Sequence, residues 1–207
     1  MKIENFQSQV CVCAVSTNLT CAKGRAEMGE NMVNVMEAME KRSSTRGYTS
    51  DAISDEELKV LIHAGLQAPT ATNRQEVHFT VLKGNDPVLQ EIEEEKNRLR
   101  NLSAPEHNFY YEAPAVIFLS AEEGFRWSTM DAGIAVENMA LAAEGLGLGS
   151  LVIGCIYDAL RGEKQAYFSE RLRFPDKYHF EIAIAVGHKG VAKAPHTYDA
   201  EARVSYL

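Results

Sequence analysis

The sequence predicts an α+β sandwich, in which helices and strands follow one another without repeated βαβ units. Residues 115–121 form an apolar run too continuous to alternate, which indicates a strand buried inside a sheet. Residues 128–146 predict a long helix whose alanines and glycines permit close packing against another helix. The length of 207 residues suits one domain with a core of its own.

Two further helices are predicted from apolar spacing and from residues that start or stop a helix. Residues 33–39 place apolar side chains along a short amphipathic helix, and we interpret its methionine stripe as core packing. Ser54 and Glu57 have the spacing of a capping box, which predicts the start of a second helix. Pro69 is expected to end that helix, because proline cannot continue it.

A charged helix, a further helical stretch and three short strands complete the predicted elements. The charged helix starts at Pro87 and runs to about residue 102, and we interpret its residues 91–100 as a solvated face. The further helical stretch is expected near residues 160–171. The short strands are expected at residues 78–82, 151–154 and 179–186.

The run Gly-Leu-Gly-Leu-Gly over residues 145–149 is similar in composition to a dinucleotide-binding fingerprint. Such a fingerprint follows a strand and opens a helix, so that the helix N-terminus meets the pyrophosphate. Here the run closes the long helix, where glycine provides the left-handed C-terminal conformation. We therefore expect no Rossmann-type nucleotide site at this position.

The formal net charge of -8 argues against a nucleic-acid or anionic-membrane partner, because both require broad positive fields. No apolar run approaches the roughly 18 to 20 residues of a membrane span, so we expect a soluble, cytoplasmic protein. The four cysteines lack the paired spacing of a zinc ribbon, and no metal site is expected from Cys11, Cys13, Cys21 or Cys155. Unpaired thiols in a reduced cytosol are the favoured interpretation.

The first 31 residues fit poorly with the rest of the chain. Residues 10–15 are too short for a signal-peptide core, and Lys2 is offset by Glu4. Residues 29–31 could be encoded by a ribosome-binding sequence ahead of Met32. We therefore expect residues 1–31 to be a disordered extension or a wrongly assigned start, and residues 32–207 to form one domain.

Two polar segments carry the main indication of function. Residues 42–46, Arg-Ser-Ser-Thr-Arg, set two guanidinium groups around two serine hydroxyls, and these donors match the oxygens of a phosphate. Residues 68–75 form an amide-bearing loop, and amides can pair with a ring edge that both donates and accepts hydrogen bonds. A solvated helix end and an ordinary turn are the competing interpretations. Together the two segments indicate a cofactor with a phosphate tail and a ring head.

The order of these motifs along the chain resembles the nitroreductase family of FMN-dependent oxidoreductases, over about residues 33–193. The motifs that carry the resemblance are residues 42–46, the loop 68–75, the Ala-Pro-led strand 113–119, the glycine-rich helix end 145–149, residues 152–154 and the strand end 186–188. The resemblance implies a three-layer sandwich with a mixed, mainly antiparallel sheet flanked by helices, assembled as an intertwined homodimer. Residues 32–207 would then be a single FMN-binding domain.

The resemblance also implies which residues contact the cofactor. Positions that hold the FMN phosphate, ribityl chain and pyrimidine edge match Arg42, Ser43, Ser44 and Arg46. Positions that reach the flavin from the other subunit match Pro69, Thr70 and Asn73, with Gln75 nearby. Positions at the end of a strand beside the ring match Ile153 and Gly154, and the backbone N–H at the Gly154 position donates toward flavin N5.

The chain departs from the family pattern at two places. The family usually has an arginine near its C-terminus that helps hold the phosphate. This chain has Lys189, Lys193 and His196 in that region before its sole late arginine, Arg203, and Lys189 is our candidate for the contact. The tryptophan that often follows the loop is absent, and Glu-Val-His stands there at residues 76–78.

No Ser-His-Asp, Cys-His or metal-ligand cluster stands out, which suits a flavoenzyme because the flavin carries the chemistry. The resemblance implies a ping-pong enzyme that uses NAD(P)H to reduce nitroaromatic, quinone or similar small-molecule electron acceptors. One alternative is a family member with a narrow acceptor, such as an enoate, a halogenated aromatic or free flavin. Others are a non-catalytic flavin-binding protein and a binding domain without flavin.

Overall fold

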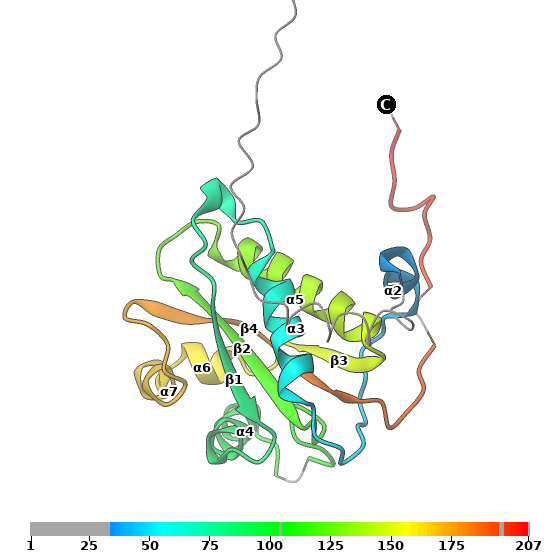
Figure 1. The fold of residues 1–207 in the computed structure, drawn as a ribbon. Coiled ribbons are helices and arrows are strands. Elements are labelled where there is room, and N and C mark those ends of the chain that lie inside the picture. The colour runs from blue at the N-terminus through cyan, green and yellow to red at the C-terminus, as the bar shows by residue number, and fades with distance from the viewer. Residues whose placement is uncertain (1–33, 104, 195–196, 207) are drawn as a thin grey trace, which may run out of the picture. The chain divides into compact units, whose positions relative to one another are not determined.

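The computed structural model describes residues 34–103, 105–194 and 197–206 (Figure 1). The elements in chain order are α2 (Val35–Lys41), α3 (Asp55–Leu66), the short 3₁₀ helix η1 (Ala71–Asn73), β1 (His78–Lys83), α4 (Pro87–Arg100), β2 (Ala115–Glu122), α5 (Ser128–Gly145), β3 (Leu148–Ile153), α6 (Tyr157–Arg161), α7 (Gln165–Arg171) and β4 (Tyr178–His188). Our expectation for residues 1–31 falls outside the described residues and stays a prediction. Within the described ranges, no helix is long and apolar enough to cross a membrane.

The strands form one sheet in the order β1-β2-β4-β3, with antiparallel pairing between all neighbours. β2 and β4 are central, and Ala115 pairs with Val186 near one end of the two strands. β3 and β1 are the two edges of this sheet. A parallel bridge between Ser44 and Ser150 adds to the outer side of β3. The predicted mixed, mainly antiparallel sheet is confirmed.

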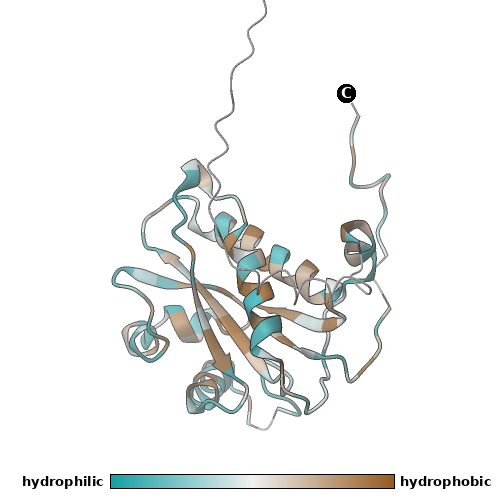
Figure 2. Ribbon diagram, viewed as in Figure 1, coloured by the Kyte–Doolittle hydropathy of each residue, from teal (hydrophilic) through white to brown (hydrophobic). Residues whose placement is uncertain are grey.

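Helices cover both faces of the sheet, so the predicted three-layer sandwich is also confirmed (Figure 1). On one face, α3 and α5 pack on a core that includes Ile117 and Met139. On the other face, α4, α6 and α7 pack on a core that includes Phe118 and Phe168. Ile117 and Phe118 are neighbours in β2 and point to opposite faces, as consecutive strand residues must. Figure 2 shows hydrophobic residues along the strands.

The structure confirms the two helix ends that were predicted from short sequence motifs. Ser54 Oγ accepts a hydrogen bond from the Glu57 N–H at 3.2 Å, and the Glu57 carboxylate accepts one from the Ser54 N–H at 2.9 Å. This capping box opens α3 as predicted. α5 ends at Gly145, and Gly147 just beyond it has a φ of 77°, so the glycine run closes a helix.

The helical stretch predicted near residues 160–171 is two helices, α6 and α7. Gly162 separates them, and a Cβ at this position would lie 2.6 Å from the carbonyl oxygen of Asp158. Only glycine allows so close a turn. β3 begins three residues earlier than predicted, because pairing of Leu148 with His188 carries both strands beyond their apolar centres.

The interpretation of the charged run in α4 as a solvated face is wrong for three of its residues. Glu93, Glu95 and Lys96 are buried. The Glu93 carboxylate accepts hydrogen bonds from Lys96 Nζ at 2.8 Å and from the Phe109 N–H at 2.9 Å. Glu95 pairs with Lys164 at 2.7 Å. A buried charge is tolerated where it is paired, and two of these partners come from distant parts of the chain.

The interpretation of the first helix's methionine stripe as core packing is wrong for this chain. Val35, Met36 and Met39 of α2 are 59%, 63% and 51% exposed. α2 contacts α5, and Ala38 is its buried residue. The face of α2 that carries the small side chain of Ala38 therefore packs on the core, and the large apolar side chains face away from it. Val33, the first residue of the predicted stripe, lies outside the described residues.

Candidate functional site

The segment 42–46 runs beside the edge strand β3. Ser44 forms a parallel bridge with Ser150, and the Thr45 N–H donates to the Ser150 carbonyl oxygen at 2.9 Å. Thr45 is buried against Gly149, where a Cβ would lie 2.7 Å from Thr45 Oγ1. Glycine at this position therefore lets the segment approach the strand closely.

The two arginines of this segment have different surroundings. Arg42 is partly buried, and its Nε lies 3.6 Å from Oε1 of Glu137 on α5. Arg46 is exposed, and its guanidinium makes no ion pair or hydrogen bond within the described ranges. Ser43 Oγ donates a weak hydrogen bond to the Lys193 carbonyl oxygen at 3.5 Å. Arg46 is thus the cation of this segment that can pair with an anion without losing an acidic partner.

Lys189 reaches the same region from the end of β4. It forms an antiparallel bridge with Tyr48, and the neighbouring Gly190 N–H donates to the Gly47 carbonyl oxygen at 2.9 Å. Lys189 Nζ lies 2.8 Å from both carboxylate oxygens of Glu144, which is buried near the end of α5. The charge of Lys189 is therefore already matched within the chain. Its role as a phosphate ligand stays a prediction.

The residues predicted to lie beside the flavin ring are at the C-terminal end of β3, where Ile153 is buried and Gly154 is exposed. Gly154 follows Ser150 by four residues, roughly 13 Å along an extended strand. A Cβ at position 154 would meet only Ile182 Cδ1, at 3.7 Å, so packing within the chain does not require glycine here. An elongated ligand along β3 can thus contact residues 42–46 at one end and the Gly154 backbone at the other.

The loop 68–75 is folded tightly on itself. The Asn73 N–H donates to the Thr70 carbonyl oxygen at 2.9 Å, and the Gln75 N–H donates to Thr70 Oγ1 at 2.9 Å. Gln75 Nε2 donates to Asn73 Oδ1 at 3.0 Å. Thr72, Asn73 and Gln75 have φ values between 53° and 56°, a left-handed conformation that costs about 1–2 kcal/mol per residue. Such strain is held in place by the contacts around it.

The loop is anchored at the first turn of α5, where the Ala71 N–H donates to Oδ2 of Asp131 at 2.9 Å. The partner of Lys189, Glu144, lies near the other end of the same helix, roughly 20 Å from Asp131 along the axis. Figure 1 shows η1 and α2 near opposite ends of α5. In a single chain, the structure therefore brings residues 42–46 together with β3 and Lys189. It leaves the predicted loop residues apart from residues 42–46, namely the exposed Pro69, Asn73 and Gln75 and the partly buried Thr70.

Two buried acids beside the loop were not identified from the sequence as part of the site. Glu76 is 5% exposed and Asp131 is 3% exposed. Both carboxylate oxygens of Glu76 lack a hydrogen-bond donor within the described residues. Burial and, after it, the neighbouring Asp131 carboxyl raise the pKa of Glu76. In the sequence, Glu76 showed only as a departure from the family's tryptophan, since no local pattern indicates that an acid will be buried.

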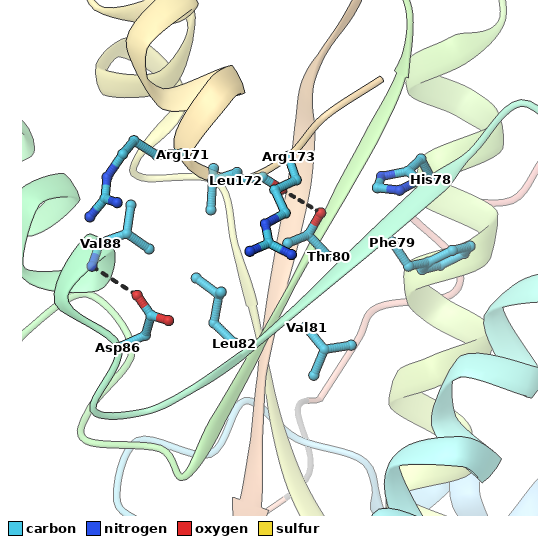
Figure 3. A pocket seen from close by; sticks show the side chains of 10 residues that line it. All are labelled: His78, Phe79, Thr80, Val81, Leu82, Asp86, Val88, Arg171, Leu172 and Arg173. Carbon is cyan, nitrogen blue, oxygen red and sulfur yellow. Dashed lines mark hydrogen bonds between the residues drawn. The ribbon is translucent and has the colours of Figure 1, made fainter. Parts of the chain in front are cut away.

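Two cavities in the described part relate differently to these residues. A cavity of about 120 Å³ adjoins the loop and is lined by Gly65, Leu66, Ala68, Thr70, Gln75, Val77, Phe79 and Ala135. A cavity of about 450 Å³ lies at the edge strand β1, where Arg173 extends beside Thr80 and Leu82 (Figure 3). None of the predicted site residues lines the second cavity. We therefore treat it as separate from the candidate site.

The fold and the site define a class: an α+β sandwich whose edge strand carries a segment of two arginines and two serines suited to an elongated anionic ligand. The Nitroreductase family model matches residues 39–188, which is most of the chain. The chain belongs to the Nitroreductase family.

Relatives and solved structures agree with this assignment. An FMN reductase (NAD(P)H) of Bacillus subtilis (strain 168) is 28% identical over 176 residues, which cover 76% of this chain and 66% of that relative. A nitroreductase with bound FMN from Desulfitobacterium hafniense DCB-2 has a TM-score of 0.73 and 29% identity, over 85% of this chain and 100% of that one. A nitroreductase with bound FMN from Bacteroides fragilis NCTC 9343 has a TM-score of 0.76 and 27% identity, over 84% and 99%.

Proposed function

We propose that this chain is an FMN-dependent oxidoreductase that takes electrons from NAD(P)H and passes them, by a ping-pong mechanism, to a small organic acceptor such as a nitroaromatic or a quinone. The observation that carries this proposal is the placement of residues 42–46 against β3, in a family whose solved members include FMN complexes. FMN, when bound, supplies the hydride-transfer chemistry, and the protein supplies binding and orientation.

The residues along β3 fit the parts of FMN. Arg46 and Arg42 offer planar donor forks for the phosphate, and Ser43 and Ser44 offer hydroxyls. Arg46 has no competing acidic partner, so it would bind the phosphate with the smallest rearrangement. At the far end, the exposed Gly154 lets its backbone N–H approach the ring without a side chain between them.

We further propose that a second copy of the chain completes the site. The loop 68–75 lies near the opposite end of α5 from Lys189, so its amides would reach the FMN of the partner subunit. The exposed stripe of α2 offers apolar surface for such an interface, and so do Met130 and Ile134 on α5, which are 57% and 36% exposed.

Free flavin is a second candidate acceptor, because the Bacillus subtilis relative is named an FMN reductase. A cytoplasmic location suits the free thiol of Cys155, since thiols stay reduced in that compartment. The proposed partners are thus a second copy of the chain and a small-molecule electron acceptor.

Anaerobic reduction of the FMN-loaded protein tests the proposal. Prompt bleaching of bound flavin on addition of NADH or NADPH is the expected result. Flavin that binds but stays yellow would indicate a non-catalytic flavin protein, and a protein that refuses added FMN would be a binding domain without flavin. Mixing the reduced enzyme with nitroaromatics, quinones, enoates, halogenated aromatics and free flavin then identifies the acceptor by the rate at which the yellow colour returns.

A further inference from the structure

We propose that Tyr48 is a positioning residue for the cofactor phosphate. Its hydroxyl holds the Thr45 carbonyl oxygen and so fixes the peptide unit from which Arg46 extends. The consequence for FMN rests on the proposed function, in which Arg46 binds the phosphate. The hold on the backbone does not rest on it, since it is a property of the chain alone.

The first step is that the backbone on both sides of Arg46 is tied to the sheet. Before Arg46, the Thr45 N–H donates to the Ser150 carbonyl oxygen of β3 at 2.9 Å. After it, the Thr49 N–H donates to the His188 carbonyl oxygen of β4 at 3.0 Å. Arg46 therefore lies in a short span of chain that passes from the outer side of β3 to the end of β4.

The second step is the contact that the Tyr48 hydroxyl adds within this span. It lies 3.2 Å from the Thr45 carbonyl oxygen and 3.4 Å from the Ala185 carbonyl oxygen of the central strand β4. A hydroxyl carries one proton, so it donates to one of these oxygens or is shared between them. The peptide unit between Thr45 and Arg46 is thus held at its oxygen by a side chain that lies on β4.

The third step is that the fold makes room for Tyr48. A Cβ at Gly187 would lie 2.8 Å from Tyr48 Cδ1, and a Cβ at Gly190 would lie 2.9 Å from the Tyr48 carbonyl oxygen. Any larger residue at either glycine would therefore displace Tyr48. The ring packs against the core that includes Phe118. Burial raises the pKa of the Tyr48 phenol, although the Arg46 guanidinium opposes the change, so the hydroxyl keeps the proton that it donates.

This support matters for Arg46 because no acidic side chain within the described residues orients its guanidinium. The direction of the exposed side chain is set first by its own backbone. Without the hydroxyl, the peptide unit before Arg46 is held less firmly, and fixing the guanidinium on a phosphate costs more conformational entropy. Tyr48→Phe keeps the ring and removes only the hydroxyl, so it should weaken binding of the phosphate and leave the fold intact.

The test compares FMN with riboflavin, which is FMN without its phosphate, in fluorescence titrations. Tyr48→Phe should bind FMN about three- to tenfold more weakly than the wild type, as for one lost hydrogen bond. Its affinity for riboflavin should equal that of the wild type. Added to Arg46→Ala, Tyr48→Phe should cause no further loss of FMN affinity, because both changes act through one guanidinium.

Tyr110→Phe is the matched control. The Tyr110 hydroxyl is also partly buried and donates to a backbone carbonyl oxygen, that of Gly84, at 2.9 Å. Gly84 follows β1, which is the opposite edge of the sheet from β3. This variant should lose a similar amount of stability in urea denaturation and keep the wild-type affinity for FMN.

An arm without FMN tests the hold on the backbone directly. Amide hydrogen exchange of Thr45, measured by NMR and corrected for the intrinsic rate, should be about three- to tenfold faster in Tyr48→Phe than in the wild type. It should be unchanged in Tyr110→Phe. If the wild type binds no FMN, the proposed function fails, while this arm still decides whether Tyr48 holds the segment.

Other outcomes overturn the proposal. An unchanged exchange rate at Thr45 would show that the hydroxyl does not hold the backbone. Faster exchange with unchanged FMN affinity would show that the hold does not serve the phosphate. An equal loss for riboflavin and FMN, or a full further loss in the Arg46→Ala background, would show that Tyr48 acts on the site without Arg46. An equal loss in Tyr110→Phe would assign the effect to global stability.

Discussion

Arg46 differs from Arg42 and Lys189 because no acidic side chain is bound to it in the described structure. Arg46→Ala should therefore lose a charge-assisted contact to the FMN phosphate without exposing a new unpaired acid. The expected loss is about 1.5–3 kcal/mol, or about ten- to hundredfold in FMN affinity, measured by calorimetric titration. The fold should be retained, because Arg46 is exposed. Arg100→Ala, at an exposed arginine on α4, is the matched control. An unchanged affinity would remove Arg46 from the site.

Glu76 leads to a second prediction at the residue scale, on stability. Its pKa is raised in the folded protein by burial and by Asp131, whereas an unfolded Glu titrates near 4.5. The folded state therefore holds a proton that the unfolded state has lost, and stability falls as pH rises above 4.5 until the folded pKa is passed. Relative to Glu76→Gln, the wild type should lose up to about 1.4 kcal/mol per pH unit in this window.

Urea denaturation of both proteins between pH 4 and pH 9 measures this difference. Glu123→Gln, which changes charge at an exposed position, should follow the wild type. If the free energy of unfolding of the wild type and that of Glu76→Gln change in parallel with pH, Glu76 titrates in the folded protein as it does in an unfolded chain.

At the scale of an element, α4 is held to its neighbours by a buried acid. Glu95 accepts hydrogen bonds from Arg98 at 2.6 and 3.0 Å and pairs with Lys164 at 2.7 Å. Arg98 first and Lys164 after it lower the pKa of Glu95 to about 2. The stabilisation is therefore present above the ordinary value of 4.5 and is lost as pH falls toward about 2.

Glu95→Gln should lower the free energy of unfolding by about 2 kcal/mol at neutral pH, a modest value because water reaches both cations. The gap between the variant and the wild type should close as pH falls from 4.5 to about 2. Urea denaturation measures it, and Glu94→Gln, on the exposed side of the same helix, should change stability by less than about 0.5 kcal/mol. If the difference in the free energy of unfolding between Glu95→Gln and the wild type does not change with pH, the loss of stability comes from packing and not from the charge of Glu95.

At the scale of the whole molecule, the separation of residues 42–46 from the loop 68–75 makes a prediction about the dimer. Arg46→Ala and Asn73→Ala homodimers should each have two damaged sites. When the two proteins are unfolded and refolded together, about half of the dimers should be mixed, on random pairing at a symmetric interface. Each mixed dimer has one doubly damaged site and one intact site, so activity should recover to about a quarter of wild type.

The control for this experiment is each variant refolded alone, which must be nearly inactive. Mixed dimers can be counted after purification with two different affinity tags. If mixed dimers form and remain inactive although both single variants are inactive, residues 46 and 73 serve one subunit's pocket and the shared-site model is wrong.

The sequence by itself determined the features that depend on neighbours a few residues away. The capping box of Ser54 and Glu57, the central strand β2 and the glycine run that closes α5 were predicted and are present. Their physical causes are a local hydrogen bond, an unbroken apolar run and a left-handed backbone, which are visible in a short stretch of chain. The order of the motifs also identified the family, because it depends only on residue type and spacing.

Only the tertiary structure decided which polar groups are buried and which apolar groups are exposed. Lys189 was a candidate ligand for phosphate, but the fold places it 2.8 Å from Glu144, 45 residues away. Glu76 and Asp131 are buried although both are acids, while the methionines of α2 are exposed. Burial and charge pairing depend on groups that are distant along the chain and close in space. The same residue type therefore has a different environment, pKa and role according to what the fold places beside it.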